Sequence, residues 1–270
     1  LKTGKHIVLD IFLVIQLMPL VWLLLFSLKD NNQIFNRPAF SIPSPFVFEN
    51  YARVFQNLQI HIFVCNSAVV TAMTMLVTLL FASMAAYACT RMRFRYGETL
   101  IMVFLAGIMI PVHASLLPLF MLFKNIGILN TRLSLIIPYT AFALPVALFI
   151  LTGFLKTLPV ELEEAACMDG CNIYQIFYRI VLPLLKIPLS TIAVFTFINS
   201  WNEYPLQLVM LTQNESKTIA LGIASKLSEM SNDFGLIMAG AALASVPIII
   251  VFLCFRKYFT QGITMGAVKG

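Results

Sequence analysis

The sequence predicts an all-α membrane protein in which six transmembrane helices are joined by short loops and one longer helix-turn-helix segment. Two features of the composition support this fold class. Hydrophobic residues make up 60% of the 270 residues and charged residues only 11%, whereas soluble domains carry about 25% charged residues. The apolar residues are also grouped into runs long enough to cross a bilayer of about 30 Å as helices. We therefore expect one transmembrane domain covering residues 1–270.

Six apolar runs account for the predicted spans. They cover about residues 7–28, 62–88, 99–122, 133–155, 187–210 and 235–255. The first run follows Lys2 and Lys5, as a signal peptide would. Its apolar part is too long for a signal core, and no small-residue cleavage site precedes Lys29. We expect it to be a retained span.

The segments around the second and third spans carry turn and break signals. Residues 31–57 are rich in Pro, Asn and Phe, which predicts an extended or irregular strap with aromatic side chains at headgroup level and a short amphipathic helix near residues 51–55. The third span contains Pro111, His113 and Pro118. A kinked or broken helix is expected there, and such breaks occur where protein or a water-filled cavity satisfies the freed backbone groups.

The distribution of Lys and Arg predicts the orientation of the chain in the membrane. With both termini in the cytoplasm, eleven basic residues lie inside and seven outside. The inside set is Lys2, Lys5, Arg91, Arg93, Arg95, Lys156, Arg179, Lys186, Arg256, Lys257 and Lys269; the outside set is Lys29, Arg37, Arg53, Lys124, Arg132, Lys217 and Lys226. The run from Arg91 to Arg95 in a very short loop is the strongest local signal.

Residues 157–186, between the fourth and fifth spans, are too long and too patterned for a simple connector. Pro159 can open a helix, and carboxylates in its first turns favour the positive end of the helix dipole. These carboxylates are Glu161, Glu163 and Glu164. Gly170 then ends the helix, most simply as a left-handed cap.

A second helix follows Gly170. Asn172 and Gln175 have the spacing of a capping box, and the pair Leu182-Pro183 ends the helix. The apolar positions of an amphipathic stripe lie between them: Ile173, Ile176, Phe177, Ile180 and Val181. This stripe must pack on the protein's own core or enter a cleft in another protein.

The pattern E-A-A-x3-G-x9-I-x-L-P, which begins at Glu164 and ends at Pro183, resembles the loop signature of permease subunits in binding-protein-dependent ABC importers. Three further stretches look like the maltose-type carbohydrate importers: the one from Phe48 to Tyr51, the triplet Trp201-Asn202-Glu203, and residues 262–270. The resemblance covers essentially the whole chain. It is closest to the smaller, six-span permease, which implies the type I importer permease fold and a place in a bacterial inner membrane.

The resemblance implies a coupling helix around residues 162–174 that docks on a cytoplasmic ATPase dimer, with Glu164 as the charged contact and Gly170 as the turn. The residues expected to couple to the ATPase are Glu163, Glu164, Ala165, Ala166, Asp169, Gly170, Tyr174, Ile180, Leu182 and Pro183. The alternative is that Glu164 only complements the dipole of an exposed helix.

Two further partners are implied by the resemblance. A second homologous permease is expected beside this chain in the membrane, and an extracytoplasmic solute-binding protein is expected to meet the polar outer loop 212–233. The candidate contacts in that loop are Gln213, Asn214, Glu215 and Lys217. A solvated hairpin is the alternative for this loop.

Polar side chains in the fifth span are candidates for a translocation pathway. Glu203 lies inside the apolar run, and an intramembrane carboxylate usually faces protein or a cavity. Its polar and aromatic neighbours complete the candidate set of Trp201, Asn202, Glu203, Tyr204 and Gln207. Such groups suit a sugar, which needs partners for its hydroxyls and a stacking face. A buried polar cluster that fixes helix packing is the alternative.

The sequence argues against several other classes of function. It contains no G-x-x-x-x-G-K-[ST] phosphate loop, so we expect no cofactor on this chain and place ATP and magnesium on the partner ATPase. Cys167 and Cys171 lack a further Cys or His nearby, so no metal site is expected. No clustered catalytic set or nucleic-acid-binding pattern occurs. An importer of a non-sugar solute and an ion-coupled secondary transporter remain alternatives.

Overall fold

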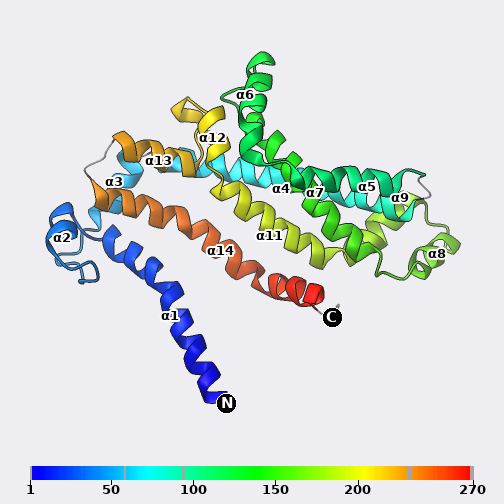
Figure 1. The fold of residues 1–270 in the computed structure, drawn as a ribbon, viewed down its shortest axis with the longest axis horizontal. Coiled ribbons are helices and arrows are strands. Elements are labelled where there is room, and N and C mark those ends of the chain that lie inside the picture. The colour runs from blue at the N-terminus through cyan, green and yellow to red at the C-terminus, as the bar shows by residue number, and fades with distance from the viewer. Residues whose placement is uncertain (1, 58, 93–94, 230–232, 268–270) are drawn as a thin grey trace. The chain divides into compact units, whose positions relative to one another are not determined.

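The computed structural model describes residues 2–57, 59–92, 95–229 and 233–267, and no strand occurs among them (Figure 1). Internal contacts divide the chain into two compact units. Unit 1 comprises Leu1–Cys65 and Lys217–Ile249, and unit 2 comprises Asn66–Ser216 and Ile250–Gly270. Arg93 and Lys269, which entered the charge count above, lie outside the described residues.

Unit 1 holds the first helices and part of the last one. Its elements are α1 (Lys2–Ser27), α2 (Asn31–Asn36), α3 (Glu49–Asn57), the start of α4 (Ile60–Arg91), α13 (Ile219–Glu229) and the first part of α14 (Phe234–Ala267). Helix α3 confirms the short amphipathic helix. Helices α2 and α13 lie in segments predicted to be loops. Helix α2 forms because the Asp30 carboxylate caps its N-terminus by accepting from the Gln33 backbone N–H at 2.7 Å.

The end of α1 is tied to the segment that follows it. The Asn50 side-chain amide donates to the backbone oxygens of Ser27 (3.0 Å) and Lys29 (2.9 Å). The Ser27 oxygen is one that the end of α1 leaves without an intrahelical partner. Gly235, near the start of α14, packs so closely here that a Cβ on it would stand 2.2 Å from the Lys29 oxygen. Only glycine fits at position 235.

We therefore expect Gly235→Ala to lower the stability of the protein by about 1–3 kcal/mol, the usual cost of overpacking. The melting temperature in detergent measures this effect. Gly153→Ala is the matched control, because no atom lies within 4 Å of a Cβ built at Gly153, in the last turn of the helix Leu133–Leu155. That control should be neutral or stabilising, and an equal melting temperature for both variants would contradict the packing described here.

Unit 2 holds the remaining elements. They are the rest of α4, α5 (Gly97–Ala106), η1 (Gly107–Met109), η2 (Val112–Ser115), α6 (Leu116–Asn125), α7 (Leu133–Leu155), α8 (Glu161–Met168), α9 (Ile173–Ile176), η3 (Phe177–Val181), α10 (Leu182–Leu184), α11 (Lys186–Asn202), α12 (Pro205–Met210), η4 (Asn214–Ser216) and the last part of α14, from Ile250. Helix α7 packs against α5 and α11, and α12 packs against α6 and α7. Helix α7 is thus the central helix of this unit.

Among the described residues, four helices are long and apolar enough to cross a membrane: Leu9–Ser27, Ile60–Arg91, Leu133–Leu155 and Phe234–Phe255. The number rises to six if each of two bent helix pairs forms one span. One pair, Gly97–Met109 with His113–Asn125, bends by 89°. This break falls at Pro111 and His113, where the sequence predicts it.

The prediction of one uninterrupted fifth helix over residues 187–210 is wrong. Helix α11 ends at Asn202, Glu203 is extended (φ −63°, ψ 134°), and α12 begins at Pro205. Proline has no backbone N–H to donate, and its ring disfavours helical geometry in the residue before it. Pro205 therefore starts a new helix.

Candidate functional site

The segment between α7 and α11 forms the predicted helix, glycine corner and second helix. Helix α8 ends at Met168, and Gly170, two residues later, has a φ of +81°. The Cys171 backbone N–H donates to the Ala166 oxygen and the Gly170 N–H to the Cys167 oxygen, both at 3.0 Å. This is the Schellman pattern of a left-handed cap. Helix α8 begins at Glu161, two residues after Pro159, so the proline precedes the helix and does not open it.

The second helix starts with the predicted capping box. The Asn172 Oδ1 accepts from the Gln175 backbone N–H at 2.9 Å, and the Gln175 Oε1 accepts from the Asn172 N–H at 2.8 Å. One turn of π-helix, η3, follows, and π turns are frequent at functional sites. The helix ends at Leu184, one residue beyond the predicted Leu182-Pro183 stop.

The apolar stripe of this loop packs on the protein's own core. Ala166, Ile176, Phe177 and Val181 are buried together with residues of α4, α7 and α11. The rings of Phe177 and Tyr87 lie 5.3 Å apart, and Ile180 and Leu182 are half-buried against the same cluster. The loop is therefore rigidly seated on the ends of the long helices.

A polar clamp between α4 and α8 reinforces this seat. The Arg91 Nη2 donates to the backbone oxygens of Leu155 (2.7 Å) and Leu158 (2.6 Å), and its Nε lies 3.1 Å from Glu163 Oε1. The Tyr87 hydroxyl donates to Glu163 Oε2 at 3.1 Å. Because Arg91 and Glu163 side chains are only 9% and 16% exposed, Glu163 belongs to the anchoring of the loop.

Loss of this clamp should loosen α8. We expect Glu163→Gln to speed hydrogen exchange of the α8 amides by about tenfold or more, since hydrogen bonds to charged groups contribute about 1.5–3 kcal/mol. Exchange measured by mass spectrometry tests this. The exposed Glu161 provides the control Glu161→Gln on the same helix, and equal exchange in both variants would argue against the clamp.

The opposite face of the loop is open. Glu164, Ala165, Asp169 and Gly170 are exposed, and so are several apolar side chains, namely Leu162 at 44%, Met168 at 89%, Ile173 at 39% and Tyr174 at 73%. Pro183 is exposed as well. The loop thus presents an apolar surface with carboxylates beside it.

A second feature of unit 2 is the break between α11 and α12. The Glu203 carboxylate caps α12, accepting from the Leu206 backbone N–H at 2.7 Å and the Gln207 N–H at 3.3 Å. The Tyr139 hydroxyl on α7 donates to the same carboxylate at 2.7 Å. Glu203 thereby satisfies backbone groups that the break exposes and joins the break to α7.

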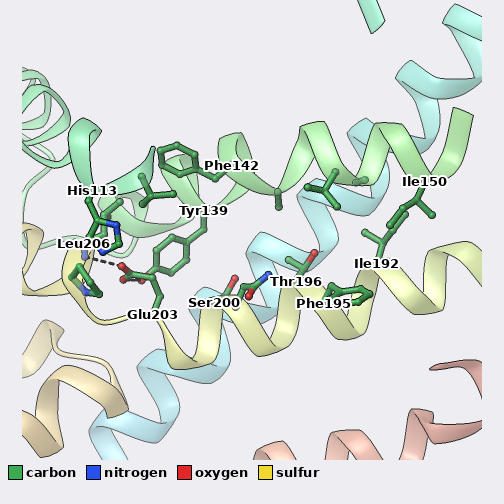
Figure 2. Close-up of a pocket in the computed structure, with 16 residues that line it drawn as sticks. His113, Tyr139, Phe142, Ile150, Ile192, Phe195, Thr196, Ser200, Glu203 and Leu206 are labelled. Carbon is green, nitrogen blue, oxygen red and sulfur yellow. Dashed lines mark hydrogen bonds between the residues drawn. The ribbon is translucent and has the colours of Figure 1, made fainter. Parts of the chain in front are cut away.

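Glu203 also lines a cavity of about 480 Å³ between α7 and α11 (Figure 2). At the Glu203 end the walls carry the polar side chains of His113 and Tyr139, whereas Ile150, Ile192 and Phe195 line the opposite, largely apolar end. The polar lining residues are His113, Tyr139, Thr196, Asn199, Ser200 and Glu203. A pocket of this size and mixed lining suits a small ligand.

The other predicted pathway residues lie elsewhere. Trp201 is buried and stacks on Phe197 at 5.4 Å, Gln207 is 1% exposed, and neither lines the cavity. The exposed Asn202 donates to the Ile198 oxygen at 2.9 Å. Tyr204 precedes α12 and is 37% exposed. Of the five candidates only Glu203 reaches the cavity.

The loop after α12 is fixed to a turn after α6. Asn130 (φ +60°) accepts at Oδ1 from the backbone N–H groups of Thr212 (2.6 Å) and Gln213 (3.1 Å). The Asn66 amide donates to the Glu215 oxygen at 2.7 Å. Gln213, Asn214 and Glu215 are exposed, whereas Lys217 is only 9% exposed.

Residues 78–265 match the family described as binding-protein-dependent transport system inner membrane component. The chain belongs to this family. The matched region contains the loop, the cavity and the break. The permease of this family is a membrane subunit of ABC importers, and the apolar helices of this chain agree with a multi-pass inner membrane protein.

Characterised relatives align over nearly the full length of the permease. It is 31% identical to a diacetylchitobiose uptake system permease protein of Streptomyces coelicolor, covering 98% of this chain and 88% of the relative. It is 32% identical to a trehalose/maltose transport system permease protein of Thermococcus litoralis, covering 95% and 93%.

Its fold is similar to a chain in the crystal structure of a bacterial ABC transporter involved in the import of the acidic polysaccharide alginate. The TM-score is 0.83 at 22% identity, with 96% of both chains covered. The permease therefore has the helical fold that the resemblance implied.

Sequence reasoning missed residues that lie far from their partners along the chain. Arg91 was counted only as a topology signal, and Tyr139 was not singled out. The cavity-lining positions of α11 were within reach, because Ile192, Thr196, Asn199, Ser200 and Glu203 follow the three- and four-residue spacing of one helix face. Starting from Glu203 and reading backwards along that spacing would have found them.

Proposed function

We propose that this permease is the transmembrane subunit of an ATP-driven bacterial importer for a carbohydrate, with a separate subunit hydrolysing ATP. Family membership supports the importer. Named relatives that carry diacetylchitobiose, arabinooligosaccharides, or trehalose and maltose support an oligosaccharide as the solute. ATP and magnesium would then bind the ATPase, and this chain would carry no cofactor.

The observation that carries the proposal is the open face of a firmly anchored loop. Glu164, Ala165, Asp169, Gly170 and Tyr174 lie on the exposed side, where a cytoplasmic ATPase subunit can contact them. Ala166, Ile180 and Leu182 pack inward, and Glu163 is clamped. These inward residues, together with the exposed Pro183 at the end of the loop, are proposed to hold the docking face in place.

The loop is continuous with the cavity through a single helix. Helices α9, η3 and α10 connect through Leu185, with a bend of 72°, to α11. The 17 residues of α11 span about 25 Å at 1.5 Å per residue. Ser200, near the far end of α11, lines the cavity, and so does Glu203, which directly follows the last residue of α11. A displacement of the loop by the ATPase would therefore move the cavity wall, which is the mechanical basis of the proposed alternating access.

The cavity is proposed as part of the translocation pathway. Hydroxyl, amide and carboxylate groups from Tyr139, Asn199, Ser200 and Glu203 offer hydrogen-bond partners to sugar hydroxyls, and Phe142 and Phe195 offer aromatic surface. A second permease subunit would complete the pathway from the other side.

With both termini in the cytoplasm, the exposed residues Gln213, Asn214 and Glu215 face outward and are proposed to meet the solute-binding protein. A transporter chain of similar fold, from the bacterial alginate ABC transporter, has been solved in complex with a periplasmic protein that holds an alginate pentasaccharide. This complex supports a solute-binding protein as a partner of the present chain. Lys217, being buried, is proposed only to support this loop.

Uptake by proteoliposomes tests the proposal. The permease, its co-expressed partner subunits and the binding protein are reconstituted, and entry of radiolabelled oligosaccharides is followed with ATP or ADP inside. We expect uptake when ATP is enclosed and no uptake when ADP is enclosed. The ATP-driven uptake should be unchanged when ionophores collapse the ion gradients. Gradient-driven uptake without ATP would show a secondary transporter, and ATP-driven uptake of only non-sugar solutes would overturn the carbohydrate assignment.

A further inference from the structure

Unit 1 contains a cluster of exposed aromatic side chains that the transport mechanism does not use. Five large apolar residues in the segment after α1 are at least half exposed: Phe35 at 66%, Phe40 at 50%, Ile42 at 72%, Phe46 at 50% and Phe48 at 67%. The only charged residue between positions 31 and 48 is the exposed Arg37. Exposed phenylalanines at this density require a covering surface.

The backbone of this segment is held from within by polar groups of the α1 end. The Lys29 side chain is fully buried, and its Nζ donates to the Ala39 oxygen and the Ser41 Oγ, both at 3.1 Å. These two acceptors flank Phe40. The Lys29 ammonium also lies 4.8 Å from the Phe26 ring centroid. Burial, with the nearby charge of Arg37, lowers the pKa of Lys29.

Gln33 holds the second half of the segment in the same way. Its side-chain oxygen accepts from the Ser44 backbone N–H at 2.9 Å, and its amide donates to the Pro45 oxygen at 3.0 Å. Gln33 is only 5% exposed. The residue after this pair is Phe46, so here too the side chain that satisfies the backbone stands next to an exposed aromatic ring.

The depth of the Phe46 and Phe48 rings in a membrane can be inferred from their position next to the end of α1. The Val47 backbone N–H donates to the Leu28 oxygen at 2.9 Å, one residue beyond the end of α1, and Phe46 and Phe48 flank Val47 and stack on each other at 5.9 Å. The stretch Leu9–Ser27 of α1 has a mean hydropathy of 2.3, and most of its side chains are exposed. A bilayer around α1 therefore ends beside the two rings.

From this geometry we propose that the segment from Phe35 to Phe48 is a preformed anchor that contacts phospholipid at the membrane–water interface. Irregular backbone beside the hydrocarbon region is costly unless its polar groups are satisfied. Lys29 satisfies the Ala39 oxygen from inside, and Gln33 satisfies the Ser44 N–H and the Pro45 oxygen. The aromatic rings can then lie at headgroup level, as aromatic belts do, and Arg37 can pair with lipid phosphates. The proposal requires only that α1 spans the membrane.

Photo-crosslinking in cells that express the whole transporter tests this contact. Benzoylphenylalanine is placed at Phe46 or Phe48, the cells are irradiated, and the purified chain is examined by mass spectrometry. Two controls bracket the result. Val14 on α1 is 66% exposed and reports lipid contact in the hydrocarbon region, whereas the exposed Gln213 reports a loop in water.

We expect phospholipid adducts at Phe46 and Phe48 in yields near that of Val14 and at least about fivefold above Gln213. In a Gln33→Leu background, the adduct at Phe46 should fall severalfold while that at Val14 is unchanged. Crosslinks mainly to another protein at Phe46 and Phe48, or lipid yields no higher than at Gln213, would overturn the anchor. An unchanged Phe46 adduct with Gln33→Leu would overturn the role of the internal scaffold.

Discussion

Replacing Gly170 by valine is expected to abolish transport, while replacing it by asparagine is expected to leave most of it. Gly170 stands at φ +81°, a conformation that costs a β-branched residue about 1–3 kcal/mol. Valine should therefore rearrange the corner between the two loop helices, and uptake should fall to about a tenth or less. Asparagine tolerates this region far better. Space is not the obstacle, because no atom lies within 4 Å of a Cβ built at Gly170.

The initial rate of solute uptake at equal membrane levels of protein measures this effect. Gly127 offers a matched control, since it has φ +74° and equally open surroundings but lies in a turn far along the chain from the loop. Gly127→Val carries the same backbone strain and should retain uptake. An equal loss of uptake in both valine variants would mean that backbone strain destabilises the protein in general. The corner after α8 would then have no special role in transport.

Removal of the Glu203 carboxylate should be the other large effect. Glu203→Ala leaves the Tyr139 hydroxyl and two α12 backbone N–H groups without their acceptor. Each such loss costs about 1–3 kcal/mol in a buried site, so uptake should fall at least about tenfold. Glu203→Gln keeps an oxygen acceptor and should retain partial uptake. Tyr139→Phe removes one bond and should have the smallest effect.

Uptake per folded molecule separates a pathway role from a packing role. If Glu203 contacts the solute, Glu203→Gln should change the relative uptake of different oligosaccharides. If it only joins the break to α7, the variants should lower thermal stability without changing that ratio. Glu98→Gln, at an exposed carboxylate in the first turn of α5, is the control and should behave as wild type.

The local features of the loop were predictable because their causes are local. The capping box of Asn172 and Gln175 needs residues three positions apart, and the left-handed cap needs a glycine at one position. Both appear in the structure where the sequence places them. The break at Pro111 was predictable for the same reason, since proline acts on its immediate neighbours.

The features that escaped prediction depend on distant contacts or on polar capping. The Arg91 clamp joins residues more than sixty positions apart, and no local pattern indicates it. The helix break at Glu203 lies inside an apolar run, so hydropathy alone favours one continuous span. The capping of α12 by Glu203 becomes visible only when Pro205 is considered together with the carboxylate two residues earlier.

The central claim is that the exposed face of α8 and α9 receives a separate ATPase, and the most direct measurement is co-purification. The permease is isolated from membranes in mild detergent as wild type and as a double variant, Met168→Asp with Tyr174→Asp, which places two charges on the most exposed apolar side chains of this face. We predict that a cytoplasmic ATPase subunit accompanies the wild type and is lost from the variant, while the second permease subunit remains bound to both. Retention of the ATPase by the double variant, together with normal ATP-driven uptake, would contradict the account.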